Sequence, residues 1–257
     1  VDDPDLAGAD LVYVLDSPEM AAELAANAAS LHRLYGVPFR TVVLRRNLGF
    51  ADANNAGVSV ARGRLLLLLN SDVIPDRPGW LSTMVEFLDA TPTAGAVGPK
   101  LVYEDGSIQH AGLYFLRPEG SPWWENAHYH KGLHRSFPGA AKSRVVPGLT
   151  GACLLLAREL WDKVGGLSGA YVQGDYEDSD LCLRIGELGY ECWYLPAAEL
   201  YHLEGQSYPT PLRRLTSRYN TWLHTHLWDA RIAEVMQATA GPRPRTRTRT
   251  RKSKDVK

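Results

Sequence analysis

Hydrophobic and polar positions along the chain follow two periods, a short one typical of strands and a longer one typical of helices. Apolar runs predict strands at 11–15, 39–44, 65–69 and 95–102. Helical spacing of apolar residues between these runs predicts helices at 18–35, 51–62 and 81–88. This alternation predicts an α/β layered fold. Leu65–Leu69 is apolar at every position, which is typical of an interior strand of a parallel sheet covered by helices.

The regular pattern is lost between residues 113 and 147, a segment rich in Trp, His, Pro and Gly. We predict a long loop or insertion there, over one edge of the sheet, and such loops are often functional. Regular spacing then resumes, with strands at 149–156, 191–195 and 200–202 and helices at 158–164, from Glu177, and at 212–236. The predicted globular domain therefore covers residues 1–236.

The residues after this domain differ in charge from the rest of the chain. From Arg243 to the end there are eight Lys and Arg against one acid, Asp255, which gives +7 and leaves −8 for the other residues. The run from Pro242 to Lys252 has no apolar residue to bury, so we predict a disordered basic tail at 237–257. A solvated tail is the favoured interpretation, and contact with anionic lipid headgroups or nucleic acid is the alternative. We expect no specific nucleic-acid partner.

The composition is that of a globular protein. Of 257 residues, 45% are hydrophobic and 22% are charged, which allows a sizeable core. No apolar run reaches the roughly 18–20 residues of a membrane span, and there is no secretory signal pattern. The three cysteines, Cys153, Cys182 and Cys192, lack the spacing of a metal site. We therefore expect no disulfide framework and a reducing compartment.

An acid and a histidine follow predicted strand ends. Asp72 closes the run Leu65–Leu69 within Asn70-Ser71-Asp72, and ligands of α/β sheets bind beyond the carboxyl ends of strands. An acid there can hold a hard cation, but Asn-Ser-Asp is also good turn sequence, and taken alone the turn is favoured. His202 ends a short strand and can ligate a metal as neutral imidazole, although a lone His is more often structural.

A cluster of acids opens the helix that begins at Glu177. One of Glu177, Asp178 and Asp180 can act as a general base for a hydroxyl group. The same residues can also cap the helix and complement its dipole. We expect both roles, with Asp178 as the chemical acid and Asp180 as the structural one.

Five motifs follow one another along the chain. They are Asn47-Leu-Gly-Phe-Ala-Asp-Ala-Asn-Asn-Ala-Gly57, Leu-Leu-Leu-Asn70-Ser-Asp72, Thr150-Gly-Ala-Cys153, Glu177-Asp-Ser-Asp-Leu-Cys-Leu-Arg184 and His202. Their order and spacing resemble the family 2 glycosyltransferases of the GT-A fold, in the bacterial rhamnosyltransferase-like or galactofuranosyltransferase-like branch that builds cell-surface polysaccharides. The resemblance implies a Rossmann-like, mostly parallel sheet with helices on both faces.

The resemblance also implies a role for each matching residue. Asp72 and His202 correspond to the ligands of Mg²⁺ or Mn²⁺, which bridges the donor diphosphate. Asp178 corresponds to the catalytic base, with Glu177 beside it. The implied donor-binding residues are Asp16, Asn47, Asn55, Asn70 and Asp72, and the residues near the acceptor and the transferred sugar are Thr150, Gly151 and Ala152.

The implied reaction is an inverting transfer of a sugar from a nucleotide-diphosphate donor to a glycan or lipid-linked acceptor. Asp178 would remove the acceptor proton as the oxygen attacks the anomeric carbon from the opposite face. A non-catalytic nucleotide-sugar or glycan-binding module is the alternative, and a hydrolase with paired carboxylates is a third. Asp72, Asp178 and His202 together favour the transferase, because a pure binder needs no base beside a metal.

Aromatic residues of the long segment at 113–147 have two interpretations of equal weight. Trp123 and Trp124, with Tyr129 and His130, either line an acceptor groove, since aromatic rings stack on sugar faces, or pin the segment to the sheet.

The sequence departs from the family pattern at two places. Asn70 replaces the first acid of the metal motif, which leaves Asp72 as its one carboxylate. The family also has a strand and a helix before the strand at 11–15, and residues 1–10 cannot supply them. Either a preceding part of a longer protein completes this βα unit, or the donor site is incomplete in this chain. We expect a cytoplasmic enzyme, peripheral at the inner face of the membrane where the basic tail contacts lipid.

Overall fold

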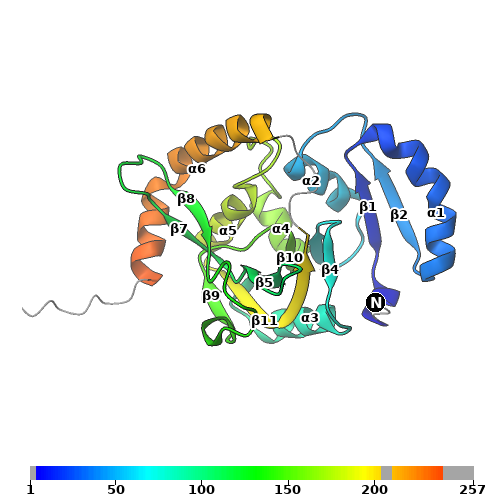
Figure 1. Ribbon diagram of the computed structural model, residues 1–257, viewed down its shortest axis with the longest axis horizontal. Coiled ribbons are helices and arrows are strands. Elements are labelled where there is room, and N and C mark those ends of the chain that lie inside the picture. The colour runs from blue at the N-terminus through cyan, green and yellow to red at the C-terminus, as the bar shows by residue number, and fades with distance from the viewer. Residues whose placement is uncertain (1–3, 204–209, 240–257) are drawn as a thin grey trace, which may run out of the picture.

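The structure is a computed structural model that describes residues 4–203 and 210–239. Most of the predicted basic tail, from residue 240 onward, lies outside the described residues. A central sheet has helices on both of its faces, and a smaller β-α-β unit lies beside it (Figure 1). The chain therefore forms the α/β layers predicted from its alternating periods.

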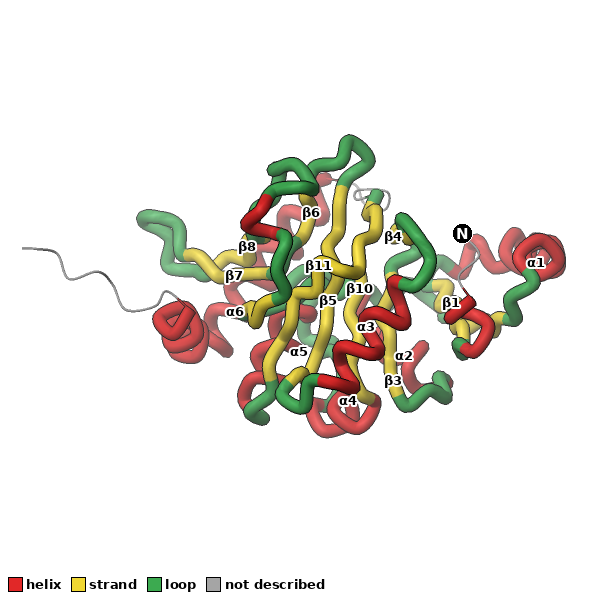
Figure 2. Tube along the Cα trace, turned by 90° about the horizontal axis from the view of Figure 1, so that it is seen from below, coloured by secondary structure: helices red, strands yellow, loops and turns green. Residues whose placement is uncertain are grey.

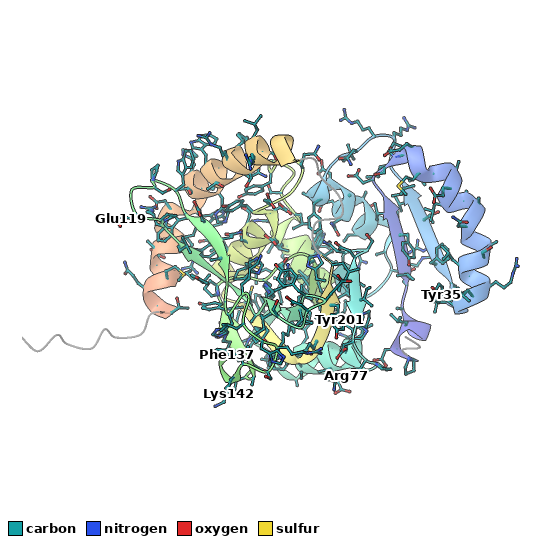
Figure 3. The ribbon with its side chains drawn as sticks, in the orientation of Figure 1. Tyr35, Arg77, Glu119, Phe137, Lys142 and Tyr201 are labelled. Atoms are coloured by element: carbon teal, nitrogen blue, oxygen red, sulfur yellow. The ribbon has the colours of Figure 1, made fainter. Side chains whose placement is uncertain are left out.

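The first elements form a unit of their own. After the 3₁₀ turn η1 (Pro4–Gly8), β1 (Leu11–Leu15) and β2 (Phe39–Val43) pair in parallel, and η2 (Pro18–Met20) and α1 (Ala21–Tyr35) connect them. Gly36 ends α1 in the left-handed conformation, as predicted. Among the described strands these two pair only with each other, and α1 has no buried residue. Figure 3 shows Tyr35 at the outer side of this unit.

The larger sheet has the strand order β3-β10-β5-β11-β4, with β6 paired to β5 and β9 paired to β11. Its strands are β3 (Leu65–Leu69), β4 (Val73–Pro75), β5 (Ala94–Val102), β6 (Ile108–His110), β9 (Arg144–Val146), β10 (Cys153–Ala157) and β11 (Glu191–His202). The strands β5 and β11 are parallel, whereas β10 runs antiparallel to both β3 and β5. The predicted strands at 191–195 and 200–202 are one strand, β11, interrupted by an irregularity between Leu195 and Glu199.

This mixed topology corrects one expectation. Leu65–Leu69 is the edge strand of the larger sheet among the described residues, and its one strand partner is antiparallel. Its all-apolar sequence instead reflects contacts on both faces, since Leu66 and Leu68 belong to one buried cluster and Leu65 and Leu67 pack against another.

The two faces of the sheet are covered by different helices (Figure 2). On one face, Trp80, Met84 and Leu88 of α3 (Trp80–Ala90) share a buried cluster with Leu155 of β10. On the other, α4 (Arg158–Val164) and α5 (Glu177–Glu187) pack in a cluster with Leu154 and Leu156. Successive residues of β10 thus point to opposite helix layers, as the pleat of a strand requires.

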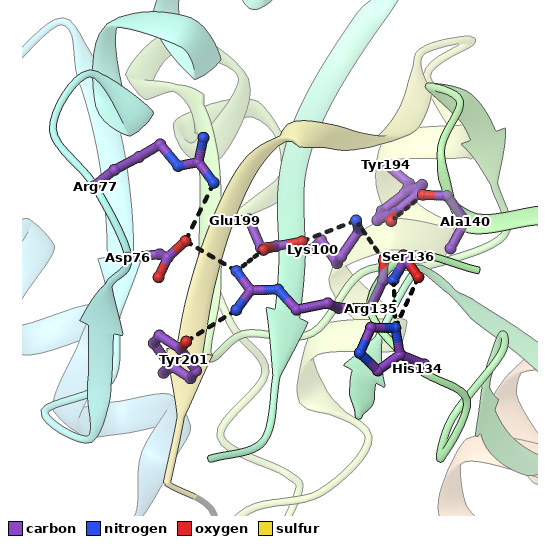
Figure 4. A network of polar contacts seen from close by, with 10 residues as sticks. All are labelled: Asp76, Arg77, Lys100, His134, Arg135, Ser136, Ala140, Tyr194, Glu199 and Tyr201. Carbon is purple, nitrogen blue, oxygen red and sulfur yellow. Dashed lines mark hydrogen bonds and ion pairs between the residues drawn. The ribbon is translucent and has the colours of Figure 1, made fainter. Parts of the chain in front are cut away.

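The segment at 113–147 is more ordered than predicted. It contains the hairpin of β7 (Leu113–Leu116) and β8 (Glu125–His128), the 3₁₀ turn η3 (Pro138–Ala140), and β9 on the edge of β11. Contacts of Arg135 with residues outside the segment hold part of it in place (Figure 4). Its guanidinium lies 2.9 Å from the Asp76 carboxylate and pairs with Glu199. It also donates to the Tyr201 hydroxyl at 2.9 Å. Lys100 Nζ lies 2.8 Å from Glu199. These partners are far apart in sequence, so they leave no periodic signal.

The last described element is the long helix α6 (Thr210–Thr239). Its Ile232 is fully buried with Phe115 of the hairpin and Leu183 of α5, so α6 joins the hairpin to the helix that carries the acidic cluster. Among the described residues, no helix has the length and apolar character to cross a membrane.

Candidate active site

Asp72 and His202, which are far apart in sequence, lie side by side. Asp72 follows β3 in the turn to β4, and β4 pairs antiparallel with the end of β11, which places Val73 opposite His202. The backbone N–H of Leu203 donates to the Asp72 carbonyl at 3.0 Å. As a result, His202 Nε2 is 3.4 Å from Asp72 Oδ1. The ladder between β4 and β11 therefore fixes the pair.

The donor atoms of this pair suit a divalent cation. Carboxylate oxygen and imidazole nitrogen are both competent ligands for such ions. His202 is buried, and its Nδ1 has no hydrogen-bond partner among the residues that the structure describes. The described residues contain no group of three or more His, Cys, Asp or Glu that could hold a metal. Within the described part of the chain, the Asp72 carboxylate and the His202 imidazole are therefore the pair of side chains here that fits a cation.

Asp178 lies in the first turn of α5 and is held by two backbone donors. The N–H of Gly151 donates to its Oδ2 at 3.0 Å, and the N–H of Ser179 donates to its Oδ1 at 2.7 Å. These bonds favour the carboxylate, but burial outweighs them and raises the pKa of Asp178 to about 6. The side chain remains partly exposed. Asp178 is therefore poised to gain or lose a proton near neutral pH.

Glu177 lies beside Asp178 in a different environment. It is only 4% exposed, and its Oε2 has no hydrogen-bond partner among the described residues. Burial, followed by the neighbouring Asp178 charge, raises the pKa of Glu177 well above its ordinary value. The two adjacent carboxyl groups therefore differ in environment, and Glu177 holds its proton more tightly than an exposed glutamate does.

Asp180 does not cap α5, whose N-cap residue is Tyr176, but it joins three parts of the structure. It accepts hydrogen bonds from the Tyr171 hydroxyl at 3.2 Å and from the Trp228 indole at 2.7 Å, and it pairs with Arg184 at 2.7 Å. These three partners come from the preceding loop, α6 and α5. Asp180 thus fixes α5 in place and leaves Asp178 as the acid with a free face.

The loop of Thr150, Gly151 and Ala152 connects the two acidic sites. Its Gly151 N–H binds Asp178, and its Ala152 carbonyl accepts from the Asn70 N–H at 2.9 Å. A Cβ at Gly151 would lie 2.8 Å from the Phe50 ring, so only glycine fits there. The three residues predicted near the acceptor therefore lie between Asp178 and the turn that carries Asp72.

The predicted donor-binding segment adjoins the same loop region from the other side. Asp16, after β1, accepts from the N–H groups of Leu48 and Gly49 at 2.7 and 2.9 Å, which shapes the turn at Asn47. Asn47 itself is exposed. The N–H of Phe50, at the start of α2 (Phe50–Val60), donates to the Gln173 carbonyl at 2.7 Å. The Asp16 and Asn47 region is thus joined to the loop that precedes Asp178.

Asn55 does not share this position. Its amide donates to the Leu167 carbonyl at 2.8 Å and accepts from the Leu167 N–H at 3.0 Å. Because both ends of the amide bind backbone, Asn55 holds that loop, and its contact with the donor stays a prediction.

The contacts of Trp124 favour the second interpretation of the aromatic residues, in which they pin the segment. Its N–H donates to Thr225 Oγ1 and its indole donates to Asp229, both at 2.8 Å, and the Arg117 guanidinium lies 4.5 Å above its ring. These contacts pin the hairpin to α6. Trp123 faces a hollow on the same side of the hairpin, bordered by residues of α6.

One residue that the sequence did not single out organises the site. Asn220 of α6 is fully buried and donates to the carbonyls of Val172, Gly174 and Asp175 at 3.0, 2.7 and 3.2 Å, while accepting from the Val172 N–H at 2.9 Å. The loop it holds contains residues at positive φ, namely Gln173, Asp175 and Tyr176. The signal in the sequence that could have indicated this role is an asparagine at an inward-facing position of a long predicted helix.

Comparisons with known proteins show the family of this chain. Residues 11–164 match the family model described as Glycosyl transferase family 2. The chain is 31% identical over 144 residues to the N-acetylglucosaminyl-diphospho-decaprenol L-rhamnosyltransferase of Mycobacterium tuberculosis, covering 51% of this chain and 44% of the relative. It is also 31% identical over 156 residues to the O-antigen biosynthesis protein RfbC of Myxococcus xanthus, covering 60% and 12%.

Among solved structures, the chain is similar to GalNAc-T7 with UDP, GalNAc and Mn²⁺. The TM-score is 0.65 at 15% sequence identity, covering 89% of this chain and 44% of that one. The chain spans less than half the length of the curated relatives it matches.

Proposed function

Because the chain belongs to glycosyltransferase family 2 and has the GT-A fold, we propose that it catalyses an inverting, metal-assisted transfer. The sugar passes from a nucleotide-diphosphate donor to a hydroxyl group of a glycan or lipid-linked acceptor. One observation carries the proposal. The loop Thr150–Ala152 binds Asp178 through Gly151 and the Asp72 turn through Asn70, so the base and the Asp72–His202 pair adjoin the same three residues.

Asp72 and His202 would hold the cation, Mg²⁺ or Mn²⁺. Their ligand atoms lie 3.4 Å apart, one a hard oxygen and the other an imidazole nitrogen. Two protein ligands leave coordination positions for phosphate oxygens and water. When bound, the cation supplies positive charge that stabilises the departing diphosphate.

Asp178 acts as the base. Its carboxylate takes the proton of the acceptor hydroxyl as that oxygen attacks the anomeric carbon opposite the leaving diphosphate. The N–H groups of Gly151 and Ser179 hold the carboxylate in one orientation. Glu177, kept neutral by burial, adds no second charge beside the base. A single displacement of this kind inverts the anomeric centre and needs no covalent intermediate.

The donor and acceptor sides follow from the same loops. We assign Asp16 and Asn47 to the nucleotide side, and Thr150, Gly151 and Ala152 to the transferred sugar and the acceptor. The names of two relatives, an L-rhamnosyltransferase and an O-antigen biosynthesis protein, support a hexosyl or deoxyhexosyl transfer in cell-surface polysaccharide synthesis.

Calorimetry with a panel of UDP-, dTDP- and GDP-sugars tests the donor site, with and without Mn²⁺. The expected result is metal-dependent binding that Asp72→Ala and His202→Ala abolish and that Asp89→Asn retains. Asp89 is a suitable control because it pairs with Arg64 at the surface. Binding that is indifferent to Mn²⁺ and to both site variants would contradict the assignment.

A binding module without catalysis is the second candidate. A binding module could carry the same acidic and histidine residues. Of the two candidates, however, only a transferase makes use of the raised pKa of Asp178. Release of free nucleoside diphosphate that requires both an acceptor and Asp178 separates the two. Tight donor binding with no turnover on any acceptor glycan would favour the module.

A further inference from the structure

The outward face of α6 carries an apolar stripe that no other described element covers. Leu215, Tyr219 and Trp222 are 68%, 43% and 44% exposed, and the His226 ring stacks on Trp222 with a centroid distance of 5.6 Å. These four residues, called the outer stripe below, are spaced four, three and four positions apart, so they lie along one side of the helix.

The opposite side of α6 provides the packing that holds the helix. Asn220, His224 and Ile232 are fully buried there against α5, its preceding loop and the hairpin. The outer stripe therefore takes no part in packing α6 against the rest of the protein. Aromatic residues of this size are costly to expose to water without a partner, so a contiguous group of them marks a contact surface.

The hairpin extends this surface. Pro122 and Trp123, between β7 and β8, border a hollow with Trp222 and His226, and Thr225 and Asp229 complete its lining. The exposed rings thus come from two elements that lie next to each other. Tryptophan and tyrosine with one apolar and one polar edge are the residues favoured at the boundary between lipid and water.

Positive charge lies next to the outer stripe. Arg214 and Arg218 are exposed on the same stretch of α6. The sequence after α6, from Arg243, adds a net charge of +7, whereas the rest of the chain carries −8. The basic charge is thus concentrated at the end of the chain that carries the apolar stripe, which fits an anionic surface.

We propose that the outer stripe, together with Trp123 and the basic sequence that follows α6, docks this protein on an anionic phospholipid bilayer. Tyr219 and Trp222 lie at the level of the headgroups, Leu215 enters the acyl boundary, and the arginines bind lipid phosphate. The proposal goes beyond the proposed function, since it assigns a surface that the transfer reaction does not use.

The shape of the patch favours a bilayer over a soluble glycan. A sugar stacked in the hollow between Trp123 and Trp222 would leave Leu215 and Tyr219 uncovered, because neither lines the hollow. A flat lipid surface covers all of them at once. Apolar rings plus basic charge give the two signals that stable surface binding requires.

Flotation of the full chain with lipid vesicles tests the proposal. One set of vesicles contains phosphatidylglycerol and phosphatidylcholine in equal amounts, and the other contains phosphatidylcholine alone. We expect binding to the first set only, weakened by salt. The double variant Leu215→Ala/Trp222→Ala should bind about tenfold or more weakly, since it removes two buried apolar side chains.

Two matched variants make the test specific. Leu227→Ala alters a residue of α6 that is 53% exposed but lies on a different side of the helix, and it should bind like the wild type. Replacing the Lys and Arg of 243–257 by Gln should abolish the preference for phosphatidylglycerol. Donor binding measured by calorimetry should be unchanged in all variants, which separates this proposal from the transferase assignment, and circular dichroism checks the fold.

Three results would overturn the proposal. The first is no flotation with phosphatidylglycerol vesicles. The second is flotation that the stripe variant leaves unchanged while the charge variant abolishes it, which would assign binding to the basic sequence alone. The third is saturable binding of a soluble O-antigen oligosaccharide that needs Trp123 and Trp222 without any vesicle binding, which would assign the hollow to a glycan.

Discussion

Single side chains at the start of α5 differ in chemistry because their surroundings differ. Glu177 is buried with an unpartnered oxygen, Asp178 is held by two N–H groups, and Asp180 is bound by Arg184, Tyr171 and Trp228. Three acids within four positions thus have three environments: a buried carboxyl group with a raised pKa, one held by two backbone N–H groups, and one bound by three side chains. Environment, rather than residue type, separates their roles.

The different environments of Asp178 and Glu177 predict different effects on activity for two isosteric substitutions. Asp178→Asn removes the proton acceptor and should lower kcat by roughly 10²–10⁴-fold with little change in donor affinity. Glu177→Gln replaces a neutral acid by a neutral amide and should retain activity to within a few-fold. Initial rates and donor calorimetry on both variants check this. Equal losses in the two variants would contradict the assignment of the base.

The pH dependence of the rate follows from the same carboxyl group. The pKa of Asp178 is about 6, and only its deprotonated form accepts a proton. The value of kcat/KM should therefore fall about tenfold per pH unit below that pKa and level off above it. Rates from pH 5 to 8 measure this, at a metal concentration that keeps the cation site saturated over the whole range. A flat profile through pH 6 would argue against Asp178 as the base.

Sequence motifs were sufficient to find the residues whose type carries chemistry. Asp72, Asp178 and His202 were identified by the family pattern, and the structure brings Asp72 and His202 together. Asn220 was missed because a single amide within helical spacing carries no motif. The contacts of Asn55 with Leu167 and of Trp124 with Asp229 could not be predicted, since a sequence does not show which distant groups an amide or an indole binds.

At the scale of whole elements, α6 holds the loop that precedes α5, the helix to which we assign the base. Asn220 is the contact that does so, through three carbonyl groups and one N–H of residues 172–175. Residues at positive φ in this loop persist only while the surroundings fix them. The position of Asp178 therefore depends on a helix that contributes no group to the reaction.

Asn220→Ala tests this dependence. It leaves several buried backbone groups without a partner and should lower the free energy of unfolding by roughly 2–4 kcal/mol. It should also lower kcat more than donor affinity, because the loop leads directly to Asp178. Urea unfolding and initial rates measure both. Asn27→Ala, at an exposed site of α1, should change stability by no more than about 0.5 kcal/mol. Equal effects of the two substitutions on stability and rate would contradict a role for Asn220 in positioning Asp178.

Elements were predictable from sequence where local periods dominate. The apolar runs and helical spacing gave β1, α1, β2 and α2 close to their observed bounds, with Gly36 as the helix end. The hairpin of β7 and β8 and the strand β9 were not predictable, because distant partners stabilise that region, among them Arg135 with Asp76 and Glu199. The order of the strands in the sheet could not be predicted for the same reason. In the sheet β10 lies between β3 and β5, although it follows both of them in the sequence.

At the scale of the whole molecule, the described residues form two bodies of unequal packing. The larger sheet is covered on both faces, and every residue of β5 is buried. The unit of β1, α1 and β2 has no buried residue in its helix, and Leu34 and Tyr35 are 72% and 63% exposed. Polar contacts hold it, notably Asp10 with Arg40 at 2.5 Å and with the Arg62 N–H at 2.8 Å.

Unequal packing predicts unequal opening. Amides of β1, α1 and β2 should exchange with solvent faster than those of β5, β10 and β11, because few apolar contacts are lost when the smaller unit opens. Asp16 and the turn at Asn47 lie in or next to this unit, so a nucleotide-sugar with Mn²⁺ should slow exchange there more than elsewhere. Hydrogen exchange followed by mass spectrometry measures both effects, with Asp72→Ala as the control that should lose the ligand effect. Uniform protection across the two bodies would show that the smaller unit is as firmly held as the sheet, and the donor would then bind a preformed site.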